Sequence, residues 1–257
     1  MGEVYYRPLI EDMTWSYSRL RCFQDCPYRF YLKYIAKCKS TPRFYSSYGS
    51  FIHELLEKYY KGILSKDELV STYIRQFQYK VEGDRPSESA GADYFANGLK
   101  YFQSFEPFDM QTLAVEDRLE FEISGIKFVG IVDYLGEKDG KLYLIDNKSR
   151  KLRKRSKRNP PTQNDLTIDE MLEQLYLYSY GVEQKYHRLP DKLCFNCFRT
   201  GVFIEEDFNY ERYQQVVAKF IKEIEGVKDV EDFPPYIEWF PCKFICDVSE
   251  ECCYNGG

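Results

Sequence analysis

The chain has 257 residues, with 36 basic against 41 acidic side chains and a formal net charge of −5 at pH 7. This balance excludes a global positive field that would draw the protein to nucleic acid, so such binding must come from a local patch. No apolar stretch approaches the ~18 residues of a membrane span, and residues 1–7 carry no signal-peptide pattern. We therefore expect a cytoplasmic protein without a membrane partner. Its nine cysteines then favour metal ligation over disulfides.

The N-terminal part of the chain, residues 1–110, is predicted to be mainly helical. Apolar side chains recur at helical spacing through residues 18–35. A second helix is expected over roughly 47–61, and the stretch 66–105 indicates two more helices that separate near Gly83–Pro86.

Residues 111–205 are predicted to form the sheet core. Alternating or apolar runs separated by turn residues indicate an antiparallel meander, followed by a helix, one or two further strands and an amphipathic helix. The three strands are Leu119–Ile123, Ile126–Leu135 and Lys141–Ile145, and the later elements are Asp169–Tyr186, Leu193–Ile204 and Asn209–Val227. This order is typical of an α/β protein. No repeat or linker interrupts it, so we expect one domain over 1–257 that ends in a cysteine-rich tail, 233–257.

Two neighbouring apolar runs of this meander end in polar catalytic candidates. One run ends in Asp133, and the next ends in Asp146, Asn147 and Lys148. The strand period of two puts Asp146 and Lys148 on one face. Carboxylates hold Mg²⁺ or Mn²⁺, and a nearby lysine can position or activate water. This set predicts metal-dependent cleavage of a phosphodiester, although a solvated strand end would give the same short pattern.

Three further candidates lie on predicted helices. His53 could supply a third ligand, preferably to Mn²⁺, although a lone histidine is commonly an ordinary core or surface residue. Gln174 and Tyr178 are four residues apart and share a helix face, where both could hydrogen-bond a phosphate or a base. Ordinary helix packing would explain the same pair.

A dense basic run directly follows the second acidic strand end. Lys148–Arg158 holds eight basic residues in eleven positions. A flexible cationic loop here, including Arg153, Lys154 and Arg155, could grip DNA phosphates by counterion release. A solvated loop is the alternative, and the position next to Lys148 favours DNA contact.

Taken in order, these residues resemble the RecB-type branch of the PD-(D/E)XK nuclease superfamily. The matching segments are Ser18-x-Leu20 with Cys26-Pro-Tyr-Arg-Phe30, Gly49-x-x-x-His53, Gly130-Ile-Val-Asp133, Ile145-Asp-Asn-Lys148 and Gln174-Leu-Tyr-Leu-Tyr178. The resemblance implies a restriction-endonuclease-like core, in which a mixed central sheet is flanked by helices. It implies that the catalytic cation is bound by His53, Asp133, Asp146 and the Asn147 carbonyl. Lys148 would stabilise the transition state or orient water, Gln174 and Tyr178 would hold DNA, and Glu116 stands where relatives often have an acid.

The cysteine pattern resembles the iron–sulfur subgroup of these nucleases, which includes helicase–nuclease subunits and CRISPR-associated exonucleases. Cys242-x₃-Cys246-x₅-Cys252 closes the chain, and Cys26 lies far upstream. The resemblance implies a [4Fe–4S] cluster that joins the two terminal segments, whereas spacing alone suits tetrahedral zinc equally well. Relatives commonly space the first C-terminal pair by two residues, and here the spacing is three. Cys253 competes with Cys252, and Cys22 with Cys26. We expect a structural role, because the tail has too little apolar periodicity to dock firmly by itself.

These observations together predict a metal-dependent DNA exonuclease that acts on single strands or DNA ends. The alternatives are an endonuclease or nickase with the same chemistry, and a non-catalytic iron–sulfur protein that binds DNA or a partner. No G-x-x-x-x-G-K-[ST] motif is present, so unwinding would need a separate helicase. The length suits a phage or prokaryotic nuclease of repair, recombination or spacer acquisition, with a helicase, recombinase or integration protein as a candidate partner.

Overall fold

The computed structural model describes residues 6–254, and within this range five strands form one sheet. Residues 1–5, at the start of the segment searched for a signal peptide, and the last three residues of the predicted tail lie outside the described part. The strands are β1 (Gln111–Ile123), β2 (Ile126–Lys138), β3 (Lys141–Asn147), β4 (Lys192–Cys197) and β5 (Val202–Asp207). The helical elements are α1 (Arg7–Glu11), α2 (Tyr17–Asp25), α3 (Pro27–Phe30), the π-helical turn η1 (Tyr31–Ile35), α4 (Phe44–Tyr60), α5 (Lys66–Lys80), α6 (Glu88–Gln103), α7 (Gln163–Tyr186), α8 (Tyr210–Lys228), α9 (Trp239–Phe244) and the 3₁₀ turn η2 (Ser249–Glu251).

The sheet is mixed, as predicted. Its strand order is β1-β2-β3-β4-β5. The first three strands form an antiparallel meander, β3 and β4 run parallel, and β5 returns antiparallel to β4. Parallel neighbours need a crossover connection, and α7 supplies it between β3 and β4.

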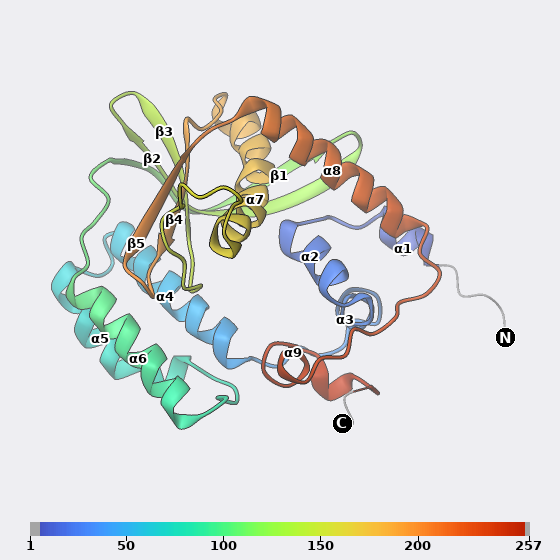
Figure 1. The fold of residues 1–257 in the computed structure, drawn as a ribbon, viewed down its shortest axis with the longest axis horizontal. Helices are drawn as coiled ribbons and strands as arrows, with labels where there is room; N and C mark the ends of the chain where they lie inside the picture. Colours follow the sequence, from blue (N-terminus) through green and yellow to red (C-terminus); the bar gives the residue numbers. More distant parts are fainter. Residues whose placement is uncertain (1–5, 255–257) are drawn as a thin grey trace.

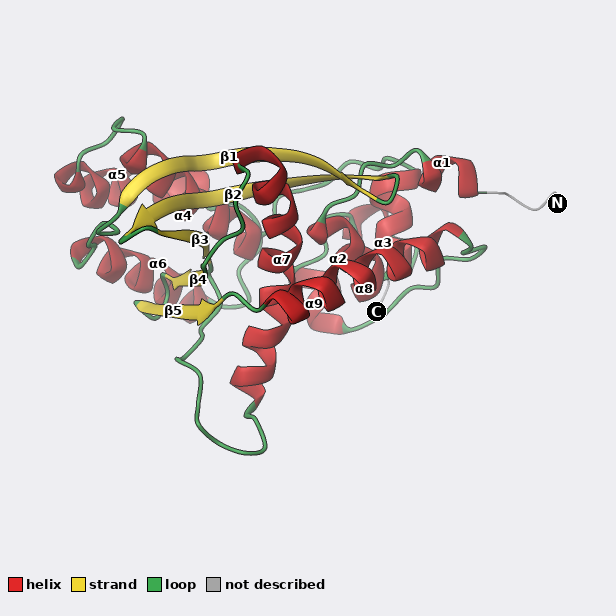
Figure 2. Cartoon of the chain, turned by 90° about the horizontal axis from the view of Figure 1, so that it is seen from above, coloured by secondary structure: helices red, strands yellow, loops and turns green. Residues whose placement is uncertain are grey.

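Helical layers cover the two faces of the sheet (Figure 1). Helix α7 packs against β1, β2, β3 and β4, and α8 packs on α7. Their apolar side chains share one core with α2, α3 and the sheet. Helices α4, α5 and α6 form a second layer around an aromatic core that includes Phe51, Tyr73 and Phe102. Figure 2 shows the long β1–β2 hairpin extending past the shorter strands.

Strands β1 and β2 are longer than predicted. β1 starts at Gln111 and not near Leu119, and β2 continues to Lys138, so Asp133 lies inside a strand and not at its end. The first residues of β1 are exposed and form the sheet edge, where no burial imposes an apolar alternation. This part of the strand therefore left no periodic signal in the sequence.

The C-terminal tail docks through polar contacts. Arg29 donates to Asp247 Oδ1 from Nε at 2.9 Å and from Nη2 at 2.8 Å, and Lys33 forms an ion pair with the same carboxylate. Arg43 donates from Nε to the Cys246 carbonyl at 2.8 Å. The apolar Phe233 is also buried. These contacts need no apolar periodicity and were not visible in the sequence. That the tail is too weakly held to dock firmly without a cluster stays a prediction.

Among the described residues, no helix combines the length and the apolar character that crossing a membrane requires.

Replacing Asp247 by alanine should release the tail. The guanidinium of Arg29 and the ammonium of Lys33 would lose their shared, largely buried counter-charge, and we expect the free energy of unfolding to fall by about 1–3 kcal/mol. Urea denaturation measures this change. Glu250→Gln is the matched control, because Glu250 is largely exposed and contacts Arg43 only at 3.5 Å. Equal stability of the two variants would contradict the proposed anchoring.

Candidate active site

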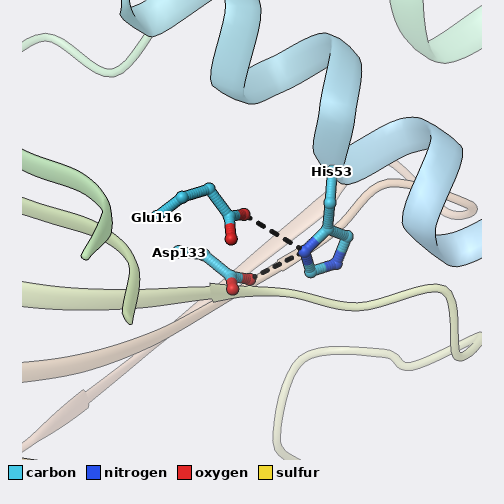
Figure 3. Close-up of side chains that lie close together, drawn as sticks. All are labelled: His53, Glu116 and Asp133. Carbon is cyan, nitrogen blue, oxygen red and sulfur yellow. Dashed lines mark ion pairs between the residues drawn. The ribbon is translucent and has the colours of Figure 1, made fainter. Parts of the chain in front are cut away.

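Three side chains from three different elements converge beside the sheet (Figure 3). His53 comes from α4, Glu116 from β1 and Asp133 from β2. Their potential ligand atoms all lie within 4.8 Å of one another. His53 Nδ1 is 3.6 Å from Glu116 Oε1 and 3.4 Å from Asp133 Oδ2. One imidazole nitrogen and two carboxylates form a donor set that suits Mn²⁺ or Mg²⁺.

A strained backbone brings Glu116 into this group. Val115 pairs with Tyr134 and Asp117 with Val132, so Glu116 lies across from Asp133. Its φ of 49° is in the left-handed region, which costs a non-glycine residue roughly 1–3 kcal/mol. Glu116, a secondary candidate from the sequence, thus belongs to the tight group of candidate ligands.

The Asn147 peptide connects the histidine to the aspartate. Its N–H donates to Asp133 Oδ2 at 2.6 Å, and its carbonyl oxygen lies 2.9 Å from His53 Nε2. A carbonyl can only accept, so Nε2 carries a proton and Nδ1 faces the carboxylates. The structure therefore uses the Asn147 carbonyl, a candidate metal ligand from the sequence, to orient His53.

The charges in this group depend on one another. Burial alone would lower the pKa of His53, but Asp133 and Glu116 raise it to about 10. Burial acts to raise the pKa of Asp133, yet His53 and the Asn147 N–H hold it below its ordinary value. The two carboxylates thus keep a positive charge at Nδ1, and a cation bound there would replace that proton.

Asp146 and Lys148 lie on the face of β3 that meets α7. Lys148 Nζ is 2.7 Å from Asp146 Oδ2 and donates to Gln174 Oε1 at 2.8 Å. Asp146 is 5% exposed, and burial raises its pKa to about 6 against the opposing effect of Lys148. The Lys148 ammonium engages Asp146 Oδ2, which has no other described partner. The ion-paired carboxylate of Asp146 lies beside the three candidate ligands.

Tyr178 packs against the strand that carries Asp133. A Cβ atom built on Gly130 would lie 2.7 Å from the Tyr178 ring, so only glycine allows this approach. Tyr178 is 7% exposed, and burial raises the pKa of its phenol. The ring therefore supports β2, and little of it is available to a ligand.

The basic segment between β3 and α7 has hydrogen-bonded contacts with the start of α7, and its predicted flexibility stays a prediction. Ser156 donates to Asp165 from its N–H at 2.8 Å and from its Oγ at 2.6 Å. Arg155 is committed to ion pairs with Asp169 at 3.0 Å and Glu206 at 2.9 Å. Arg153 and Lys154 are exposed. Of the three DNA contacts predicted in this segment, these two present charge to the solvent.

Four cysteines from the two ends of the chain line one small cavity. They are Cys26, Cys242, Cys246 and Cys252. Cys22 is buried elsewhere and Cys253 is exposed, with its sulfur 3.3 Å from the Tyr28 hydroxyl. No three of the four sulfurs lie mutually within 4.8 Å, whereas a tetrahedral zinc site separates its sulfurs by about 3.8 Å.

Cys194 and Cys197 do not form a site together. They are fully buried and belong to different cores, Cys194 on the α4 side of the sheet and Cys197 on the α7 side. Opposite faces of one strand cannot supply ligands to one metal ion.

The model of the PD-(D/E)XK nuclease superfamily matches residues 14–253. The chain belongs to this superfamily. Among solved structures, the crystal structure of a putative exonuclease from Eubacterium rectale is similar, with a TM-score of 0.57 and 15% sequence identity over 98% of this chain and 92% of that one. Likeness at this identity shows the fold alone. No curated protein matches the sequence. Membership of the RecB-type branch stays a prediction.

Sequence reasoning missed two residues of this PD-(D/E)XK site. Asn196 Nδ2 donates to Asn147 Oδ1 at 2.7 Å and to the Tyr101 hydroxyl at 2.8 Å. Neither Asn196 nor Tyr101 lies in a recognisable motif. The available signal was weak: Asn196 is a polar residue within the segment Leu193–Ile204, which was predicted to form one or two strands.

Proposed function

We propose that the protein is a divalent-metal-dependent deoxyribonuclease that degrades DNA from an end, with single strands as its preferred substrate. The observation that carries this proposal is the convergence of His53, Glu116 and Asp133 beside the Asp146–Lys148 pair. Superfamily membership supports phosphodiester hydrolysis. The similar structure described as a putative exonuclease supports the choice of an exonuclease. An endonuclease or nickase, and a non-catalytic binding protein, are the alternatives.

The donor set fits Mg²⁺ or Mn²⁺, which would be held by His53 Nδ1, Glu116 and Asp133, with the Asp146 carboxylate, ion-paired to Lys148, beside them. Such an ion, when bound, polarises a phosphoryl oxygen and lowers the pKa of a water.

Lys148, Asp146 and Gln174 supply the other contributions to catalysis. Lys148 places its ammonium at the reacting phosphate, where it orients the attacking water and offsets negative charge that develops in the transition state. Asp146 and Gln174 hold this ammonium in place. Water attacks the phosphorus in line with the departing sugar oxygen, so one phosphorus–oxygen bond forms as another breaks.

Cleavage of end-labelled DNA tests the proposal. Wild-type protein, purified without oxygen and supplied with Mg²⁺ or Mn²⁺, should shorten single-stranded DNA progressively from one end. Lys148→Ala and Asp146→Ala should each reduce the rate by about 10²-fold or more. Lys185→Ala, which breaks a surface ion pair with Asp117 at the far end of α7, is the control and should retain the wild-type rate.

Internal cuts in a circular single strand would favour the endonuclease. Equal cleavage by wild type and both site variants would show that the activity comes from another protein or another site.

We propose further that the exposed part of the basic segment, Arg153 and Lys154, contacts the DNA backbone next to the site. The segment directly follows Lys148, and its backbone is anchored by Asn164 and Asp165. An anchored cationic segment loses little conformational entropy on binding.

Neutralising Arg153 and Lys154 together should weaken DNA binding and make its salt dependence shallower. Each lost phosphate contact reduces the slope of log K against log salt by about 0.7 for a single strand. Fluorescence anisotropy without a catalytic metal measures the slope. Replacing Lys61 and Lys66, which lie at the α4–α5 connection, provides the control. An unchanged slope in the Arg153/Lys154 variant would refute the contact.

We also propose that Cys26, Cys242, Cys246 and Cys252 hold a [4Fe–4S] cluster. All four line one cavity, and the resemblance to the iron–sulfur nucleases favours a cluster over zinc. A cluster there would close a loop of more than 200 residues and reinforce the polar docking of the tail.

Cys246→Ser should remove the cluster and lower the free energy of unfolding by at least about 2 kcal/mol. Iron and acid-labile sulfide analysis and urea denaturation measure the two effects. Cys253→Ser, in the same tail but exposed, is the control and should retain iron. If the wild-type protein contained zinc and no iron, the four cysteines would form a zinc site and not an iron–sulfur cluster. Unchanged metal content and stability in Cys246→Ser would refute both.

A further inference from the structure

The Asn147 peptide contacts two of the three metal-ligand candidates, so its placement sets their geometry. Its N–H binds Asp133 and its carbonyl binds His53. Displacement of this peptide would move the imidazole ring and the Asp133 carboxylate relative to each other. Metal affinity depends strongly on such orienting contacts.

Strand β2 offers this peptide no backbone partner. The described pairing of β2 with β3 ends at Tyr134 and Ile145. Beyond that pair, the Asn147 N–H binds a side-chain carboxylate instead of a strand carbonyl. Asn147 is also the last residue of β3. Strand ends open more readily than strand centres, so the anchor must come from the other neighbour, β4.

Asn196 on β4 supplies that anchor from both side chain and backbone. Asn147 and Asn196 are the last pair of the parallel ladder. Asn196 Nδ2 donates to Asn147 Oδ1 at 2.7 Å, and the Asn196 carbonyl accepts the Lys148 N–H at 2.8 Å. The same residue thus holds the chain at Asn147 and at the catalytic lysine that follows.

Helix α6 completes the chain of contacts. The second hydrogen of Asn196 Nδ2 reaches the Tyr101 hydroxyl at 2.8 Å. Asn196 is 7% exposed, so solvent cannot readily replace either acceptor. Both amide hydrogens therefore have partners, and the amide cannot rotate without losing one of them.

We infer that Asn196, held by Tyr101, is a positioning residue that sets metal affinity through the Asn147 peptide. This inference rests on the proposed function. The residue is not one of the candidate ligands; it acts by holding Asn147, whose peptide contacts both His53 and Asp133. Its loss lowers metal affinity more than it lowers the stability of the fold.

Mn²⁺ binding, measured by electron paramagnetic resonance of the free ion, tests this inference without relying on cleavage. Asn196→Ala should weaken Mn²⁺ binding about 10-fold or more, as expected when a contact that orients a metal ligand is lost. Asn147→Ala removes the same hydrogen bond from its other side and should give a similar loss. The double variant should bind no more weakly than the single variants, because both remove one interaction.

Two further variants separate positioning from general loosening. Cys194→Ala alters a fully buried residue on the same face of the same strand and should leave Mn²⁺ affinity unchanged although it lowers stability. Tyr101→Phe keeps the ring but removes the acceptor of Asn196, and should weaken Mn²⁺ binding by a smaller factor. It also tests the inference if Asn196→Ala does not fold.

The outcomes distinguish the inference from the proposed function. An Asn196→Ala variant that binds Mn²⁺ as tightly as the wild-type protein would overturn the inference. If Asn196→Ala does not fold, the same result in Tyr101→Phe would overturn it. DNA cleavage by the wild-type protein would still uphold the proposed function. An equal loss of affinity in Cys194→Ala would also overturn it. A wild-type protein that neither binds Mn²⁺ nor cleaves DNA would overturn both.

Discussion

Asn147, the last residue of β3, links the two groups of site residues. One group is His53, Glu116 and Asp133, and the other is the Asp146–Lys148 pair. The backbone N–H and carbonyl of Asn147 bind Asp133 and His53, and its side chain binds Asn196. The residues on either side, Asp146 and Lys148, face α7. One short strand therefore joins the layer of α4 and α6 to the layer of α7. His53 and Asp133 contact the end of this strand, and Asp146 and Lys148 belong to it or directly follow it.

The cost of assembling the site is electrostatic. Asp133 and Asp146 are largely buried, and two carboxylates in a low-dielectric environment repel each other. His53 and Lys148 offset this repulsion, each beside one of them. Glu116 adds a third acid from a strained backbone. A site that stores unfavourable charge and strain is prepared for a divalent cation, which relieves both repulsion and proton competition.

The tail is stabilised by a different principle from the core. The aromatic core of the helical layer excludes water over large side chains such as Phe51 and Tyr73, whereas the tail adds the ion pairs of Asp247 with Arg29 and Lys33 to the burial of a few apolar residues. These contacts bring Cys26 near the C-terminal cysteines even before any metal is considered. A cluster at this place would reinforce an arrangement that the polar contacts already favour.

The sequence by itself determined which site residues share a face of the same strand or the same helix. Asp146 and Lys148 share a face because a strand repeats every two residues, and Gln174 and Tyr178 share one because a helix returns after four. The α/β order was readable from apolar spacing along the chain, whereas the superfamily and its mixed sheet came from the resemblance of five motifs taken in order. The single-domain assignment and the roles of the individual residues remain predictions.

Only the tertiary structure decided which distant residues meet. Glu116 joins His53 because the β1–β2 register places it across from Asp133, and no local pattern records that register. Arg155 forms ion pairs with Asp169 and Glu206, whereas the equally basic Arg153 and Lys154 in the same run are exposed. Asn196 and Tyr101 meet over a separation of 95 residues. Packing sets such contacts, because a side chain's partner across the core depends on the whole arrangement of layers and not on its own neighbours in sequence.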